Sequence, residues 1–290
     1  MLRITLEQWR MFRAVVEYGG FNQAAQGVHK SQSSIHSAVA KIESSLGVKL
    51  FHVEGRKTLL TEAGEMMLRR AEYLLDEAAK IEAIGNTLSE GIETQLRLAV
   101  DKTFPKALLY DVLEATSAQY PLLRIELHET VLKGANELLN ANQVELAISP
   151  FAGEGFSEQL CSIDFIAVAH PEHALHHMQR SLKAEDLKAH RQIVVRDSAQ
   201  HDKQNAGWLG ADQRWTVGQL DTSIDMIANG LGFAWLPKHA IDTHMDSGSL
   251  KALPLDSGAQ RSHFLYLIFK DGDNLGPAAR TLLGELRARV

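Results

Sequence analysis

The fold of this chain is decided by residues 12–64, which read FRAVVEYGGFNQAAQGVHKSQSSIHSAVAKIESSLGVKLFHVEGRKTLLTEAG. A first helix is predicted where apolar residues recur at steps of three and four before two glycines: Leu6, Trp9, Phe12, Val15 and Val16, then Gly19 and Gly20. A second, short helix contains Ala24 and Ala25, which are small enough to let another helix cross closely. Asn22 is the expected cap of this second helix.

A third helix is predicted after a turn at His29 and Lys30, with Ser31 as its cap. Its core face is predicted from apolar residues spaced four, three and four apart: Ile35, Val39, Ile42 and Leu46. The opposite face carries polar groups: Gln32, Ser33, Ser34, His36, Ser37 and Lys41. Such groups near a helix N-terminus suit contacts with base edges and phosphates, whereas on an arbitrary helix they would simply face water.

A small hairpin is predicted after Gly47, because VKLF (48–51) and TLLT (58–61) read as short strands joined by residues 53–56. Three helices followed by a hairpin are the order of a winged helix-turn-helix, which places its third helix in the major groove of double-stranded DNA. Basic residues on the wing are expected to contact the minor groove or phosphates, and a wing that only faces solvent is the alternative. The predicted DNA contacts are Ser31, Gln32, Ser33, Ser34, His36, Ser37, Lys41, Arg56 and Lys57.

The charge distribution agrees with DNA binding although the whole chain is acidic, at −6. Residues 1–61 hold eight Lys and Arg against four acidic residues, which is +4, so the remainder carries −10. Phosphate binding needs only a local positive face, because released counterions supply most of the non-specific affinity. An acidic remainder then helps to orient the basic face toward DNA.

Composition limits the other classes of protein. The chain has 290 residues, 45% of them apolar, which is enough for two or more folded units. We find neither a signal peptide nor an apolar run long enough for a membrane span, so we expect a cytoplasmic protein. The single Cys161 excludes a disulfide within the chain. No GxSxG, P-loop, HExxH or GxGxxG motif is found, so we expect no enzyme activity and no cofactor.

A long helix is predicted from Glu62 to about Glu90, because no proline interrupts this segment and Thr61 can cap it. Its apolar seam repeats every seven residues, with a row of small residues beside it. We expect this seam to pair with a second copy of the chain, so that two recognition helices read a partly palindromic site. A helix packed on its own domain is the alternative. The predicted dimerisation residues are Met67, Ala71, Leu74, Ala78, Ile81 and Leu88.

Beyond Gly91 the pattern changes to strands alternating with helices, which predicts an α/β region with mainly parallel strands. Strands are expected in QLRLAV, LRIELHETV, VELAISP, LCSIDFIAVAHP, RQIVVRDS, RWTVGQLD, FAWLP and SHFLYLIFK. Helices are expected over residues 104–118, near 134–141, from Thr222 to Gly230 and from Pro277 onward.

The first 64 residues closely resemble the N-terminal domain of LysR-type transcriptional regulators. The resemblance rests on an aromatic-rich first helix, AA in the second, SQ before the third, and then LG, LF and TEAG. The chain departs from the family pattern at Gly20, Ser33, His36 and Val53, which changes the first turn of the recognition helix and a base-reading position.

The rest of the chain resembles this family in its layout. The resemblance implies a dimerising linker helix, dimers that often form tetramers, and an effector-binding region similar to periplasmic binding proteins. We therefore expect a winged helix-turn-helix over 1–61, a linker helix over 62–91 and an effector-binding domain over 92–290. Lobe I would comprise 92–161 and 266–290, lobe II 162–265, with crossing strands near 160–165 and 264–269.

In open parallel sheets, ligands bind beyond the carboxyl ends of the strands, where helix N-termini offer free N–H groups. Capping or ordinary surface polarity is the alternative for each residue at these ends. Acidic neighbours at 101, 129 and 197 leave the charge of the ligand open. The predicted effector contacts are Lys102, Thr103, Thr130, Ser149, Pro150, Arg196, Ser198 and Thr222.

Two other groups of residues were weighed as sites. His170, His173, His176 and His177 could converge on a metal, but Pro171 interrupts regular spacing and we expect no metal there. Cys161 precedes apolar residues, which favours a buried, inert thiol over a catalytic one.

The sequence thus predicts a homodimeric or homotetrameric transcriptional regulator that binds promoter DNA and a small-molecule effector, with RNA polymerase as a candidate further partner. The competing hypotheses are an oxidant-sensing regulator of the same fold, a small-molecule-binding or catalytic protein whose helix-turn-helix only docks it, and an architectural DNA protein without an effector.

Overall fold

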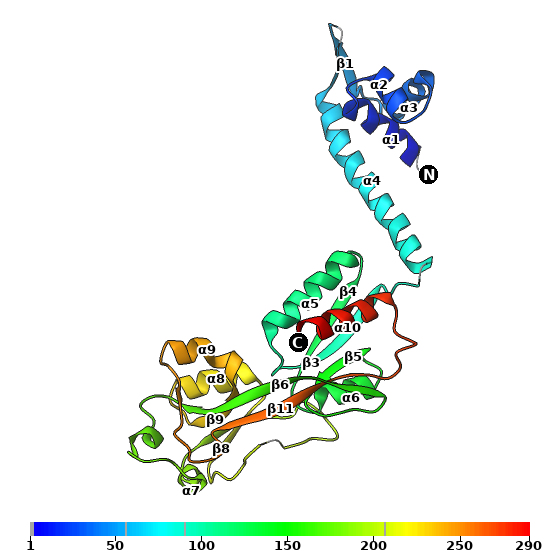
Figure 1. Cartoon of the computed structure of the whole chain (residues 1–290). Helices are drawn as coiled ribbons and strands as arrows, with labels where there is room; N and C mark the ends of the chain where they lie inside the picture. The colour runs from blue at the N-terminus through cyan, green and yellow to red at the C-terminus, as the bar shows by residue number, and fades with distance from the viewer. Residues whose placement is uncertain (1–2, 56, 90, 206) are drawn as a thin grey trace. The chain divides into compact units, whose positions relative to one another are not determined.

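The chain folds into two compact units, Met1–Ser89 and Glu90–Val290. Figure 1 shows the elements of a computed structural model in order from blue to red. The structure describes residues 3–55, 57–89, 91–205 and 207–290, without the side chains of residues 86–88.

The first unit is a winged helix-turn-helix with a long following helix, as the sequence predicts. Its core contains the large side chains of Phe12, Ile35, Ile42 and Leu50, which are all fully buried. Burial of these apolar surfaces is the main force that holds the three short helices together. Its elements are α1 (Leu6–Glu17), α2 (Phe21–Gly27), α3 (Gln32–Leu46), β1 (Phe51–Glu54), β2 (Lys57–Leu60) and α4 (Glu62–Ser89).

Three local predictions in this unit are wrong. The residue that caps α2 is Gly20, at φ 153°, and Asn22 lies inside the helix. Leu46 is 43% exposed because α3 ends there, with Gly47 in the left-handed conformation as its cap. The first wing strand begins at Phe51, three residues later than predicted, since Leu50 turns inward and is fully buried.

The second unit is an α/β structure in which the predicted elements occur in the predicted order, while α7, α9 and β10 were not predicted. The strands are β3 (Gln95–Asp101), β4 (Arg124–Thr130), β5 (Leu146–Ser149), β6 (Phe156–Ala169), β7 (Gln192–Val195), β8 (Arg214–Val217), β9 (Phe233–Pro237), β10 (Lys251–Ala252) and β11 (Gln260–Phe269). The helices are α5 (Lys106–Gln119), α6 (Gly134–Asn140), α7 (Ala184–Lys188), α8 (Leu220–Ala228), α9 (Lys238–Asp246) and α10 (Pro277–Arg289), with a 3-10 turn at Ala174–His177.

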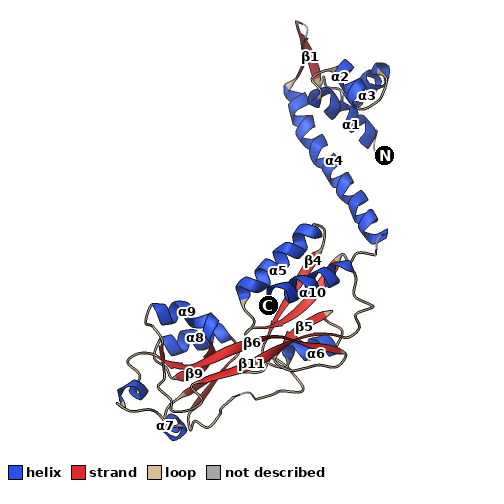
Figure 2. Ribbon diagram, viewed as in Figure 1, coloured by secondary structure: helices blue, strands red, loops and turns tan. Residues whose placement is uncertain are grey.

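One continuous sheet runs through both lobes of this unit in the order β4-β3-β5-β11-β6-β9-β7-β8. The long strands β6 and β11 pair antiparallel from Phe156↔Phe269 to Ile166↔Gln260, and they carry the chain from one lobe to the other (Figure 2). The predicted crossings at 160–165 and 264–269 lie within these two strands. The boundary between the lobes therefore falls in the middle of strands rather than in a flexible linker.

The two lobes have separate cores because alternate residues of each strand face opposite sides of the sheet. In lobe I, Leu96, Leu98 and Val100 pack under α5 and α10, whereas Ala99 faces α6. In lobe II, Val168 packs with the residues of α8 and α9, and Ala167 faces the opposite side. Each lobe is thus independently packed, and the space between them is bounded by rigid sheet ends.

Candidate DNA interface and effector cavity

Helix α3 presents the predicted polar face to solvent. The hydroxyl of Ser31 accepts a hydrogen bond from Ser34 N at 3.2 Å, which satisfies one of the free donors at the helix start. Ile35, Val39 and Ile42 are buried on the other side. The exposed residues are Ser31, Gln32, Ser33, Ser34, His36, Ser37 and Lys41. Sequence periodicity was therefore sufficient to separate the two faces of this helix.

The side chain of His36 is held by a ring contact that the sequence did not reveal. Its imidazole stacks on the ring of Phe21 from α2, with centroids 4.0 Å apart and planes only 4° apart. Phe21 in turn packs on Phe51 at 5.5 Å in an edge-to-face arrangement. The stack fixes the orientation of His36 on the surface of α3, so this side chain loses little conformational freedom if it binds a base edge.

The wing is anchored to α3 by a carboxylate. Glu43 accepts a hydrogen bond from the buried Leu50 N at 2.8 Å and pairs with Lys49 Nζ at 2.7 Å. Burial alone would raise the pKa of Glu43, but the hydrogen bonds from Lys49 and Leu50 outweigh it and lower the pKa. Lys57 lies exposed at the start of β2, opposite Glu54. The predicted contact Arg56 lies outside the described residues.

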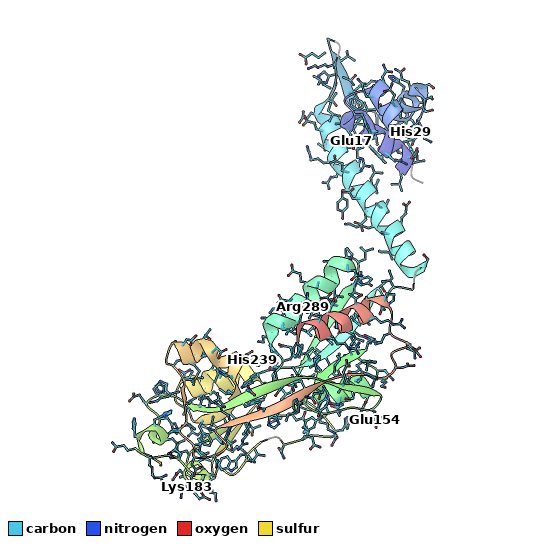
Figure 3. All side chains as sticks on the ribbon, viewed as in Figure 1. Glu17, His29, Glu154, Lys183, His239 and Arg289 are labelled. Carbon is cyan, nitrogen blue, oxygen red and sulfur yellow. The ribbon has the colours of Figure 1, made fainter. Side chains whose placement is uncertain are left out.

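Helix α4 divides the predicted dimerisation residues into two groups. Ala71 is 2% exposed and Met67 is partly buried, and both pack in the core of the first unit. Leu74 and Ile81 are 44% and 66% exposed, and Ala78 is half-buried. Side chains project from this helix along its length (Figure 3). The burial of Ala71 and Met67 is thus explained by packing of α4 within its own unit, because α1 contacts α4 there. The helix includes Leu88, whose side chain is not among those described.

A cavity of about 580 Å³ lies between the lobes of the second unit. This volume is within the range of small-molecule sites. Its floor is formed by the crossing strands, with Ile163 and Phe165 from β6 beside His263 and Arg261 from β11. Of the predicted effector residues, Lys102, Thr103, Pro150 and Arg196 line it.

The other predicted effector residues do not reach the cavity. Thr130 and Ser149 are buried behind its wall, and the Ser149 hydroxyl donates to Leu132 O at 3.3 Å and to Asn136 Oδ1 at 2.5 Å. The hydroxyl of Ser198 is turned away to Val131. Thr222 is exposed because α8 begins at Leu220, two residues earlier than predicted, so that Ser223 faces the cavity instead.

Two buried carboxylates at the cavity are already engaged by the protein. Asp101 accepts hydrogen bonds from Leu132 N at 2.7 Å and from Thr103 N at 2.9 Å. Its burial raises its pKa to about 6 in spite of these donors. Asp197 accepts from Ala199 N and Gln204 N at 2.9 and 2.8 Å. Both acids therefore stabilise loop turns beside the cavity.

The lobes are tied together on both sides of the cavity. On one side, Ser198 N donates to Val131 O at 3.1 Å, and Val131 N donates to the Ser198 hydroxyl at 2.9 Å. Further contacts bridge the lobes: Lys133 to Asp202 at 2.7 Å, Glu137 to His201 at 2.6 Å, Lys106 to Asp221 at 3.5 Å, and Lys102 to Gln219. These polar contacts join the lobes in addition to the paired strands β6 and β11 that run through both of them.

Several cavity residues were missed by sequence reasoning. They come from lobe II and from the crossing strands: Gln192, Lys203, Gln204, Trp208, Arg214, Thr216, Trp235, Arg261 and His263. Arg261 carried no local signal, because it lies at the start of a strand rather than at the carboxyl end.

Two histidines of the cluster stabilise local turns by accepting hydrogen bonds from backbone N–H groups. His173 Nδ1 accepts from Leu175 N at 3.3 Å, and His170 Nδ1 accepts from Glu172 N at 3.2 Å. Burial, helped by the charges of His190 and His176, lowers the pKa of His173 to about 4. No group of three or more metal-ligating side chains was found in the part of the chain that the structure describes. Within the same part, no helix is long and apolar enough to cross a membrane.

Cys161 is half-buried in β6 opposite Leu265 and packs against the lobe I core. Burial raises the pKa of its thiol to about 11. Only the thiolate is a strong nucleophile, so this environment disfavours reaction at neutral pH.

A winged helix-turn-helix joined to a two-lobed α/β unit with a cavity between the lobes defines a DNA-binding regulator that carries its own ligand-binding domain. Comparison with known proteins agrees with this class. A family model described as "Bacterial regulatory helix-turn-helix protein, lysR family" matches residues 6–65, and one described as "LysR substrate binding domain" matches residues 89–290. The chain therefore belongs to the LysR family of DNA-binding transcriptional regulators, with the effector-binding domain of that family.

Individual relatives agree with this assignment. The chain is 29% identical to the transcriptional regulator YeeY of Escherichia coli strain K12, over 82% of this chain and 79% of that protein. It is 31% identical to a Streptomyces viridosporus protein named "Probable hydrogen peroxide-inducible genes activator", over 99% of this chain and 96% of that protein.

A solved structure is similar across almost the whole length. The full-length virulence activator AphB of Vibrio cholerae aligns with a TM-score of 0.54 and 20% identity, covering 99% of this chain and 100% of that one. At this identity the likeness establishes the fold alone.

Proposed function

We propose that this regulator binds double-stranded promoter DNA with the exposed face of α3 in the major groove and the β1–β2 wing on the backbone. The observation that carries the proposal is the separation of the two faces of α3, where Ile35, Val39 and Ile42 are buried and the opposite polar face is exposed. The proposed base-reading residues are Gln32, Ser34 and His36, and Lys41 and Lys57 are proposed phosphate contacts.

The test is a gel shift with the upstream region of the protein's own gene, repeated with a scrambled duplex. Gln32→Ala and Ser34→Ala should weaken binding to the specific duplex, by about 1–3 kcal/mol for each lost base contact, more than to the scrambled one. Lys57→Ala should weaken both and lower the salt slope by about one. Ser44→Ala, an exposed serine near the other end of α3, is the matched control and should change neither. Equal losses on both duplexes from the first two variants would contradict base reading.

We also propose that a small molecule in the inter-lobe cavity controls this activity, in a protein that binds its ligand rather than transforming it. Asp101 and Asp197 accept hydrogen bonds from loop N–H groups, which supports a structural role for both carboxylates. A ligand can shift the position of the lobes only if it binds two arrangements with different affinity. The inter-lobe cavity therefore favours an effector-responsive regulator over an architectural DNA protein.

Self-association through α4 completes the proposal. Leu74 and Ile81 leave apolar surface exposed on α4, with the smaller Ala78 between them. A dimer, or a tetramer built from two dimers, would present two copies of α3 to the two halves of one operator. We further propose that the protein acts in the cytoplasm, because its DNA target lies there.

Oxidant sensing is a second candidate, and one relative is named for hydrogen peroxide. The sequence contains a single cysteine, so a disulfide switch within one chain is impossible. The raised thiol pKa of Cys161 also makes direct oxidation slow. We therefore favour the small-molecule effector.

A further inference from the structure

The inter-lobe cavity contains a guanidinium group that no acidic side chain neutralises among the described residues. Arg261 lines the cavity from β11, and its Cζ lies 4.2 Å above the ring of Trp235. The indole of Trp235 is fixed in turn by its Nε1, which donates to Gly258 O at 2.9 Å. A partly buried charge without a counterion is costly, and an anion that enters the cavity relieves that cost.

Flat apolar surfaces lie next to this cation. Trp208 and Trp235 both line the cavity, with ring centroids 5.9 Å apart and planes tilted by 53°. Phe165 adds a third ring, since it is the strand partner of Arg261 on β6. Aromatic walls of this kind favour a planar ring, which gains stacking and edge-to-face contacts beyond simple burial.

Two polar atoms at the cavity have no hydrogen-bond partner within the described parts of the chain. They are Oε1 of Gln192 and the hydroxyl of Ser223, in residues that are 3% and 0% exposed. The amide of Gln192 is oriented by its other end, because Nε2 donates to Trp208 O at 2.6 Å. Buried polar groups are almost always satisfied, so an unpaired acceptor in the wall of a cavity indicates a ligand donor.

These features are contiguous rather than scattered. Arg261 lies over Trp235, Trp235 is beside Trp208, and the backbone of Trp208 holds Gln192. Neither of the acids that line the cavity, Asp101 and Asp197, forms an ion pair with Arg261, and both accept hydrogen bonds from loop N–H groups instead. Arg196, Lys203 and Arg214 also line the cavity and add to its positive charge, whereas the remaining cation, Lys102, pairs with Glu129 at 3.3 Å.

We propose that the effector is a small aromatic acid, with its ring against Trp208 and Trp235, its carboxylate paired with Arg261, and a hydroxyl or amino substituent that donates to Gln192 Oε1. This inference rests on the proposed effector role of the cavity. The planar guanidinium of arginine suits a carboxylate because two parallel hydrogen bonds can form.

The test uses the purified full-length protein and measures both thermal shift and tryptophan fluorescence. The probes are hydroxy- and amino-substituted benzoates and indole carboxylates, each paired with its uncharged amide and with a saturated-ring acid of the same size. We expect the aromatic acids to raise the melting temperature, and the amides and saturated acids to do so much less. An aryl phosphate separates recognition of a carboxylate from recognition of any anion, and equal binding of the phosphate would overturn the carboxylate assignment.

Arg261→Met should weaken binding of the best acid by about 10- to 100-fold, which corresponds to the loss of a charged hydrogen bond. Arg191→Met is the matched control, because Arg191 makes the same kind of stack on Trp215, at 3.9 Å, and neither residue lines the cavity. Circular dichroism of both variants checks that they are folded.

The outcomes separate this inference from the function on which it rests. If aromatic acids fail to bind while another class of metabolite shifts the melting temperature and the gel shift, the ligand assignment is overturned and the effector role stands. If no metabolite changes either readout, the effector role itself fails. Equal losses in Arg261→Met and Arg191→Met would also refute the assignment of Arg261.

Discussion

Removing the carboxylate that anchors the wing should separate the effect of a buried hydrogen bond from that of a surface ion pair. Glu43 has a side chain only 13% exposed and serves both the buried Leu50 N–H, at 2.8 Å, and Lys49, which is 79% exposed. Glu43→Ala leaves a fully buried backbone donor unpaired, which costs about 1.5–3 kcal/mol. Lys49→Met removes only an exposed ion pair, worth about 0–1 kcal/mol. Loss of the hydrogen bond to Leu50 N should therefore account for most of the destabilisation in Glu43→Ala.

Hydrogen exchange followed by mass spectrometry measures this difference where it arises. A loss of about 2 kcal/mol should speed exchange of the Leu50 amide roughly 30-fold in Glu43→Ala, whereas Lys49→Met should change it several-fold at most. Glu43→Gln keeps an oxygen acceptor for Leu50 N and should fall between the two. Equal acceleration in Glu43→Ala and Lys49→Met, or none in either, would refute the reasoning.

The same residue predicts a pH dependence with a definite sign. The folded-state pKa of Glu43 is lowered from the ordinary value of 4.5, so its ionised form is favoured by folding. Its contribution to stability is fully present above that value and is lost as the pH falls through the lower folded-state pKa. Protection of the Leu50 amide, corrected for intrinsic exchange, should fall over this range in the wild type and be flatter in Glu43→Gln.

Three further predictions concern the core, the thiol and the assembly. Ile42→Ala should destabilise the first unit by about 2–5 kcal/mol in denaturant unfolding, while Leu46→Ala, at a 43% exposed site, should cost under about 1 kcal/mol. With a pKa of about 11, Cys161 should react with a thiol reagent at pH 8 about 100-fold more slowly in the native than in the unfolded protein, and equal rates would reopen oxidant sensing. Ile81→Asp should dissociate the assembly in light scattering, whereas the exposed control Ala79→Asp should not; an unchanged mass for Ile81→Asp would exclude this face of α4.

The inter-lobe contacts suggest how ligand occupancy reaches the rest of the protein. The lobes are held by short polar contacts at the cavity margins, such as Lys133 to Asp202 at 2.7 Å, rather than by a shared apolar core. Each exposed ion pair is weak, so the balance between two lobe positions can be shifted by a modest difference in ligand affinity. The cavity therefore suits a switch better than a permanent binding site.

The sequence alone predicted most of the elements and the two faces of α3, but it did not predict α7, α9 or β10. Steps of three and four identified α1 and α3, and the cap at Ser31 marked the start of α3 to the residue. The strand predicted in QLRLAV is β3. These properties are local: a helix or strand repeats every few residues, so its pattern is complete within a short segment.

Tertiary structure decided which residues meet. Ala71 and Ile81 occupy the same predicted seam, yet one is 2% and the other 66% exposed, because α1 covers only the first turns of α4. Arg261 reaches the cavity because β11 returns beside β6, which pairs residues about a hundred positions apart. No periodic pattern carries such information, since contacts between distant segments depend on how the sheet and its crossing strands close. The exposed polar face of α3 could thus be read from the chain, and the cavity only from the folded molecule.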